Sequence, residues 1–224
     1  MVKKSKTAKM DAVGTISSAV DDVRDSLKSL YTCDIEMVKT GLRKNPEFAH
    51  ETDVGLDMYP TEVELVAFSG NKYKIMLCDN LQENERKIIE AEKEERRVSS
   101  FCKRLKSFIN GDDYRLGWKK AKFNTGIAIA PDEKYFICGV ANSRITKGDF
   151  ILQNCIGIID PTYRGNIGLF YYNMGNGFCR DSILPLCNCC GQIFPAIRIK
   201  PIIKMVERLS ETERGMGGFG SSVK

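Results

Sequence analysis

Histidine is nearly absent from this chain of 224 residues, in which His50 is the only one. A single imidazole excludes most Ser-His and Cys-His hydrolase schemes and most zinc sites with histidine ligands. The sequence also has no apolar run close to the ~20 residues that span a bilayer, and its basic N-terminus lacks the apolar core of a signal peptide. We therefore expect an intracellular protein, cytoplasmic or nuclear, that is neither secreted nor inserted in a membrane.

Strong charge is also missing, since 34 basic and 29 acidic residues leave a net charge of only +5. A solvated surface explains this excess better than a polyanion-binding face, so we do not expect nucleic acid as a partner. Nine cysteines in an intracellular protein should be mostly free thiols. The cluster Cys187-Asn188-Cys189-Cys190, with Cys179 upstream, matches no common zinc spacing, and we interpret these residues as buried or reactive thiols.

The pattern of apolar residues divides the chain into three parts. Residues 1–30 form a basic tail and an amphipathic helix, since apolar residues recur there every three or four positions. Residues 31–212 contain many short β-prone runs separated by turns, which favours a β-barrel or sandwich. This β domain is interrupted at 82–118 by a strongly charged helical insertion. Residues 213–224 form a Gly-rich arm.

The stretch from Gly157 to Gly168 carries the clearest functional pattern. An apolar strand ends at Asp160, turns through Pro-Thr, and continues past Tyr163 into a second apolar strand, which predicts a β-hairpin. A carboxylate at the edge of a hairpin, with an aromatic ring three residues later, could activate a water beside a bound ring. Taken alone, the stretch is better explained as an ordinary surface turn, and the functional interpretation depends on the rest of the chain.

Three other segments have both a functional and a purely structural interpretation. The segment before Val63 is interpreted as a strand, a tight turn at Gly55 and another strand. Its Asp57 could lie near a cation or a phosphate cluster, or it could simply cap the turn. The polar turn Asn142–Gly148 holds a hydroxyl between cations. The arm around Arg214 and Phe219 could wrap phosphates, or be a mobile end.

Taken in this order, the segments resemble the motifs of the trimeric deoxyuridine triphosphatases, the dUTPases. The resemblance runs from about Ile35 to the C-terminus and leaves out the 82–118 insertion. Four of the five family motifs have counterparts, and the third and fifth are the most specific; they correspond to Asp53–Tyr59, Asn142–Ile145, Gly157–Gly165 and Arg214–Ser222. The resemblance implies a mainly β fold, a barrel similar to a jelly roll, and a homotrimer in which the arm reaches a neighbour's site.

The resemblance also implies a role for each matching residue. Asp160 would hold and deprotonate the attacking water, Tyr163 would pack under the deoxyribose, and Asn154 would help to read uracil, beside Gly157. Ser143 would contact phosphate, and Asp57 would lie near Mg²⁺, acting through water. The arm would close over the triphosphate with Phe219 stacked on uracil; its contacting residues are Arg214, Gly217, Gly218, Phe219 and Ser221. The implied activity is Mg²⁺-dependent hydrolysis of dUTP to dUMP and pyrophosphate.

Three departures from the family pattern keep an alternative open. Asn142 replaces the usual arginine, the glutamine of the fourth motif falls on Pro195 or Ala196, and Val223 replaces the last glycine of the arm. These changes favour, as the alternative, a catalytically weak module that senses nucleotide or binds a partner. A third possibility is the related dCTP deaminase, but that chemistry needs a carboxylate on the strand after the hairpin, where the chain has Leu169-Phe170-Tyr171-Tyr172.

Overall fold

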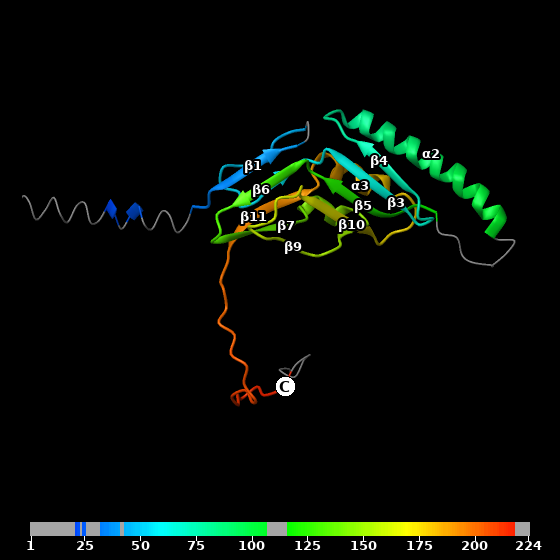
Figure 1. Ribbon diagram of the computed structural model, residues 1–224. Coiled ribbons are helices and arrows are strands. Elements are labelled where there is room, and N and C mark those ends of the chain that lie inside the picture. The colour runs from blue at the N-terminus through cyan, green and yellow to red at the C-terminus, as the bar shows by residue number, and fades with distance from the viewer. Residues whose placement is uncertain (1–20, 23, 26–31, 41–42, 107–115, 218–224) are drawn as a thin grey trace, which may run out of the picture.

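The chain forms a mainly β structure in which antiparallel strands make layers and helices lie outside them (Figure 1). The computed structural model describes residues 21–22, 24–25, 32–40, 43–106 and 116–217. The predicted helix within residues 1–30 therefore falls almost wholly outside the described residues, as do the end of the insertion and the last seven residues of the arm. The prediction of a mainly β protein is confirmed.

Within the described part of the chain, the strands form sheets of two, five and four members. The two-stranded sheet pairs β1 (Ile35–Lys39) with β6 (Ile127–Pro131). The five-stranded sheet has the order β4 (Lys72–Met76), β3 (Glu62–Ala67), β5 (Trp118–Asn124), β10 (Gly168–Asn173) and β8 (Phe150–Leu152). The four-stranded sheet has the order β2 (Leu56–Met58), β11 (Gly191–Ile197), β7 (Tyr135–Val140) and β9 (Gly157–Ile159).

Alternation of apolar and polar residues builds the core between these sheets. Along β3, Val63, Leu65 and Ala67 are fully buried while the intervening residues are only partly buried, as expected for a strand with one face on the core. Trp118 at the start of β5 packs edge-on against Tyr73 and Phe178, with ring centroids 5.4 and 5.0 Å apart. This core gives the functional strands β7, β9 and β10 a rigid support.

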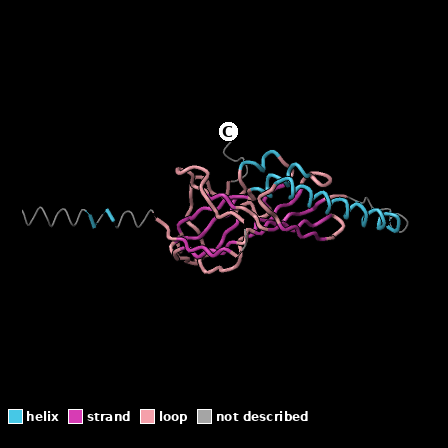
Figure 2. Tube along the Cα trace, turned by 90° about the horizontal axis from the view of Figure 1, so that it is seen from above, coloured by secondary structure: helices cyan, strands magenta, loops and turns pink. Residues whose placement is uncertain are grey.

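The charged insertion is one long helix, α2 (Leu81–Lys106), which confirms the helical character expected for this segment. It lies along the outside of the strands (Figure 2). Its inner face contains two buried carboxylates. Glu92 is paired with Arg180 at 2.6 Å, and Glu95 accepts hydrogen bonds from Asn71 and Tyr73. Because each buried acid has partners, α2 is held on the sheet by polar contacts as well as by Ile88.

The prediction of a hairpin at 157–168 is wrong. Strand β9 pairs with β7, whereas β10 pairs with β5 and β8, so the two strands belong to different sheets. The 160–167 loop between them spans from one sheet to the other. The partner of β9 is β7, and the longest partner of β10 is β5. Because β9 and β10 do not pair with each other, a gap remains between them that a hairpin would have closed.

Two further predictions of local structure need correction. The strand expected before Gly55 is a turn, because Asp53 Oδ2 accepts the backbone N–H of His50 at 2.9 Å and so favours local closure over a sheet ladder. In the β-prone run 193–203, Pro195 weakens the prediction of a central strand, yet β11 lies between β2 and β7. It is tolerated because β2 pairs only with Gly191–Ile193, which leaves the proline on a one-sided part of the strand.

The Cys-rich stretch contains a helix that the sequence did not indicate, α3 (Arg180–Asn188). Its cysteines Cys187, Cys189 and Cys190 are almost fully buried at or after the end of the helix. Burial raises the pKa of all three thiols, that of Cys187 to about 12. Among the described residues no group of three metal-ligating side chains gathers, and no helix is long and apolar enough to cross a membrane.

Candidate functional site

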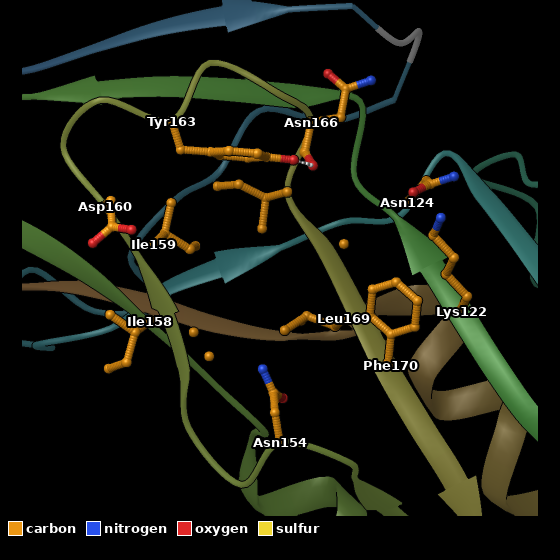
Figure 3. Close-up of a pocket in the computed structure, with 14 residues that line it drawn as sticks. Lys122, Asn124, Asn154, Ile158, Ile159, Asp160, Tyr163, Asn166, Leu169 and Phe170 are labelled. Carbon is orange, nitrogen blue, oxygen red and sulfur yellow. Dashed lines mark hydrogen bonds between the residues drawn. The ribbon is translucent and has the colours of Figure 1, made fainter.

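A cavity of about 300 Å³ opens between β9 and β10, where the hairpin was expected. Its wall includes four of the predicted site residues, namely Asn154, Gly157, Asp160 and Tyr163 (Figure 3). Asp160 and Tyr163 come from the 160–167 loop, while Asn154 comes from the turn before β9. We call this cavity the Asp160 pocket. It exists because β9 and β10 diverge into separate sheets.

The 160–167 loop is fixed by contacts within itself. Asp160 O accepts the backbone N–H of Tyr163 at 3.0 Å, which closes the turn, and the Arg164 guanidinium donates to the carbonyls of Pro161 and Tyr163. The Asp160 carboxylate itself is exposed on the pocket wall. The loop therefore presents a solvated carboxylate from a backbone that is already ordered.

Tyr163 lies folded back over Gly165. A Cβ placed on Gly165 would come within 2.3 Å of the Tyr163 hydroxyl oxygen and 2.5 Å of the ring, so only glycine leaves room for this ring position. The hydroxyl donates to the backbone O of Asn166 at 3.2 Å (Figure 3). With 47% of its surface exposed, the ring is available to a ligand in the pocket.

On the opposite side of the pocket, Asn154 depends on a second glycine. A Cβ on Gly157 would lie 3.2 Å from Asn154 Nδ2, closer than most such contacts allow. The turn is completed by Cys155, an exposed residue in the left-handed region with φ of 58°. The Asn154 amide therefore offers both a donor and an acceptor to a flat polar ring.

Sequence analysis missed a third wall of the pocket, formed by Lys122 of β5 and Phe170 of β10. The two residues are direct cross-strand partners, and Lys122 Nζ lies 5.1 Å from the centre of the Phe170 ring. This wall also includes Asn124. Only the pairing of β5 with β10 brings these residues to the pocket, and nothing in either strand alone signals that pairing.

A second polar group forms around Asp57 on β2, at the other edge of the four-stranded sheet. Gln192 Nε2 donates to Asp57 Oδ1 at 2.8 Å across the β2–β11 pairing. Gly55 allows this contact, since a Cβ there would come within 3.2 Å of the Gln192 side chain. Gln192 therefore places an amide beside Asp57, on the same strand as Pro195 and Ala196, where the glutamine of the fourth motif is missing.

The turn that contains Ser143 is attached to the segment just before β11, the strand that carries Gln192. Asn142 caps the short 3-10 helix η1 (Ser143–Lys147) by accepting the backbone N–H of Arg144 at 3.1 Å. Its amide also donates to Cys189 O at 3.2 Å, which ties the turn to the start of β11. Asn142 is buried and structural, whereas Ser143 is exposed. We call Asp57, Gln192, Asn142 and Ser143 the Asp57 cluster.

The Asp160 pocket and the Asp57 cluster do not meet within one chain. Asp57 lies on β2 and Asp160 follows β9, and β11 and β7 lie between those strands. Three strand spacings separate the two edges by roughly 14 Å. The predicted site residues are therefore brought together in two groups rather than one.

Of the arm, the structure describes residues 213–217, and none of these belongs to either group. Arg214 Nε donates to Gly217 O at 2.9 Å, and both residues lie in a segment that leaves β11 and runs away from the sheets (Figure 1). Gly218, Phe219 and Ser221 lie outside the described residues. The segment before them mixes charged residues with exposed apolar ones, such as Ile202 at 100% and Leu209 at 86%.

No family model matches the sequence. Curated relatives do match it. The deoxyuridine 5'-triphosphate nucleotidohydrolase of Escherichia phage T5 is 33% identical over 105 residues, which cover 46% of this chain and 69% of that protein. The chain belongs to the dUTPase family. The Clostridium tetani family member is 26% identical over 200 residues, 87% of this chain and 98% of the relative.

Solved structures of the family align at lower similarity. A mutant dUTPase of Staphylococcus bacteriophage 80alpha, solved with dUpNHpp, has 16% sequence identity and a TM-score of 0.49. The alignment covers 85% of this chain and 98% of that chain.

Proposed function

We propose that this protein hydrolyses dUTP to dUMP and pyrophosphate, as its family membership implies. The observation that carries the proposal is the arrangement of Asp160, Tyr163 and Asn154 around one cavity. Those three side chains offer a base, a flat apolar surface and an amide, which are what a water, a deoxyribose and a uracil require.

In the proposed reaction, Asp160 accepts a proton from a water that attacks the α-phosphorus. The new bond forms between the water oxygen and phosphorus, the bond from phosphorus to the bridging oxygen breaks, and pyrophosphate leaves with that electron pair. A carboxylate suits this role in a chain with a single imidazole. Tyr163 packs against the deoxyribose where a 2′-hydroxyl would collide, and Asn154 reads the polar edge of uracil.

The phosphates are assigned to the Asp57 cluster and the arm. Ser143 donates a hydroxyl, and Arg214 supplies charge-assisted hydrogen bonds. The donor set suits Mg²⁺ held mainly by phosphates and water, because the cluster offers one carboxylate, Asp57, itself oriented by Gln192. When bound, Mg²⁺ offsets the negative charge of the triphosphate. Gly217, Gly218 and Ser221 give the arm backbone N–H groups and a hydroxyl, and Phe219 stacks on uracil.

A complete site then needs more than one chain, and we propose a homotrimer. The Asp160 pocket of one subunit would face the Asp57 cluster of another, since the two lie on opposite sheet edges within one chain. Exposed apolar residues in the segment that joins β11 to the arm support this assignment. Ile202, Ile203 and Leu209 are each at least 78% exposed in the single chain, a cost that burial against a neighbour removes.

The test is pyrophosphate release from dUTP in the presence of Mg²⁺, with dCTP, dTTP and UTP as competing substrates. We expect dUTP to be turned over fastest, and removal of residues 213–224 to lower the rate strongly. Turnover of dUTP no faster than that of an Asp160→Ala variant would contradict the proposal.

One observation favours the weaker alternative, a nucleotide-sensing module. Asn142 is buried against Cys189 and brings no positive charge to the phosphates. Arg144 does not replace it, because it lines a separate groove with Glu85 and Asp181. Nucleotide binding at micromolar concentration without hydrolysis would identify this module. Ammonia release from dCTP would instead identify a deaminase.

A further inference from the structure

Tyr163 is connected to the N-terminal strand β1 by a short series of hydrogen bonds. Its hydroxyl donates to the backbone O of Asn166 at 3.2 Å. The side chain of Asn166 lies in turn 2.9 Å from Thr40 Oγ1, a contact between residues 126 positions apart. Thr40 follows β1 directly, and its backbone N–H donates to Gly126 O at 2.6 Å.

We propose that Thr40 is a positioning residue which, through Asn166, sets the ring of Tyr163 and so the preference for deoxyribose over ribose. This inference rests on the proposed function of the Asp160 pocket. To exclude the 2′-hydroxyl group of ribose, the Tyr163 ring must be held at a defined position in the pocket. A displacement of about 1 Å is enough to lose a positional effect of this kind. Tyr163 is half exposed, so packing alone does not fix it.

The other contacts of the loop leave this position unsupported. Arg164 holds the first half of the loop through the carbonyls of Pro161 and Tyr163. The end of the loop is held by Ile167, whose N–H donates to Ile127 O at 2.8 Å. Asn166 lies between these two anchors and is the residue that receives the tyrosine hydroxyl. Its side chain reaches outside the loop to Thr40, which is why Thr40 controls it.

The contact between Thr40 and Asn166 depends on the hydroxyl group of Thr40 and not on its methyl group. Thr40 Oγ1 also lies 3.0 Å from Gly126 O, and a hydroxyl has only one proton to donate. It therefore donates either to Asn166 Oδ1 or to Gly126 O. In the second case the Asn166 amide is turned by 180°, so that Nδ2 faces Thr40 and donates to Oγ1. Both arrangements need the oxygen and neither needs the methyl group. Serine keeps the contact, whereas valine, of the same shape, removes it.

The experiment compares Thr40→Val with Thr40→Ser in the full chain. The ratio of kcat/KM for dUTP to that for UTP is measured for each, together with the affinities for dUMP and UMP. We expect Thr40→Val to lower the ratio about fivefold, the change that corresponds to one net hydrogen bond of about 1 kcal/mol. KM for dUTP should rise while kcat stays nearly constant, and Thr40→Ser should match the wild type.

Asn166→Ala provides the second arm of the test. It should lower selectivity as Thr40→Val does, and the double variant should lose no more than either single one, because both act on one contact. Unchanged selectivity in Thr40→Val, or equal loss in Thr40→Ser, would overturn the inference. A wild-type chain that fails to hydrolyse dUTP contradicts the proposed function instead, and the dUMP and UMP affinities still decide the role of Thr40.

Discussion

Asp160 and Asp57 lie at opposite edges of one sheet, and the sequence builds the pocket and the cluster around them in different ways. The four predicted site residues of the pocket fall within ten positions of the chain, from Asn154 to Tyr163. The cluster combines residues 57, 142, 143 and 192, which only the pairing of β2, β11 and β7 brings together. A local site can thus be recognised as a motif, whereas a dispersed one depends on strand register.

The largest effect should come from Asp160, where the proposed chemistry takes place. Asp160→Asn keeps the shape of the side chain but removes the base, and a positioned general base contributes about 10²–10⁴-fold in rate. We expect kcat for dUTP to fall within that range while dUMP affinity is retained, measured by pyrophosphate release and by calorimetry. A variant with more than a tenth of the wild-type rate would assign the base to another residue.

On the same edge of the sheet, a substitution of Gly165 tests whether substrate binding depends on the position of the Tyr163 ring. In Gly165→Ala the new methyl group would lie 2.3 Å from the tyrosine hydroxyl oxygen, so the ring has to move. We expect KM for dUTP to rise about tenfold, or about 1.4 kcal/mol in binding. Steady-state kinetics provide the check. An unchanged KM, with a cooperative thermal transition retained, would show that the ring does not contact the sugar.

These two residues show how far the sequence alone could reach. The order Asp160, Tyr163, Gly165 is contained in one uninterrupted stretch, so their joint placement was predictable. The hairpin was not, because the alternation around residues 157–168 fits any antiparallel partner and does not reveal that β9 and β10 choose different ones. Lys122 and Phe170 were missed for the same reason.

The Asp57 cluster shows a second limit. Gln192 was not among the predicted site residues because its partner, Asp57, lies 135 positions away in the chain. Its contact with Asp57 depends on the register of β2 and β11 and on the absence of a side chain at Gly55. The mainly β class could be predicted from the many short β-prone runs separated by turns, and the helix α2 from its long charged segment.

A change on the β2 edge should weaken the contacts to the phosphates of the substrate and leave the contacts to uracil and deoxyribose intact. Gln192→Met preserves the length of the side chain but removes the donor to Asp57 Oδ1. We expect KM for dUTP to rise about fivefold, the equivalent of one net hydrogen bond. The affinity for dUMP, with a single phosphate, should change much less. Equal losses for both nucleotides in binding assays would contradict the division between the two edges.

The smallest effect on enzyme activity is expected from the cysteines. Their thiols should instead differ clearly in how fast they react with an alkylating reagent. Cys155 is exposed beside Asn154, whereas Cys187, Cys189 and Cys190 are buried with raised pKa values. Iodoacetamide at pH 8 should therefore modify Cys155 in the native protein and reach the buried three only after unfolding. Peptide mass spectrometry provides the measurement. Rapid native modification of Cys187 would contradict the buried arrangement around α3.

The same burial sets a pH dependence of stability. An unfolded thiol has a pKa of about 8.5, whereas burial raises that of Cys187 to about 12 in the folded chain. The folded state thus favours the protonated thiol, and this contribution is complete below about pH 8.5 and declines as the pH rises towards 12. Thermal unfolding of Cys187→Ala should show a weaker loss of stability between pH 8 and 10 than the wild type. A steeper loss would oppose this assignment.

The central claim is that a working site combines the Asp160 pocket of one subunit with the Asp57 cluster of another. An Asp160→Ala chain and a chain carrying Asp57→Ala and Ser143→Ala should each be inactive alone. Co-expressed, with mixed assemblies verified by native mass spectrometry, they should recover dUTP turnover far above either variant, because some sites then unite two intact edges. Mixed trimers that form and remain inactive would contradict the account.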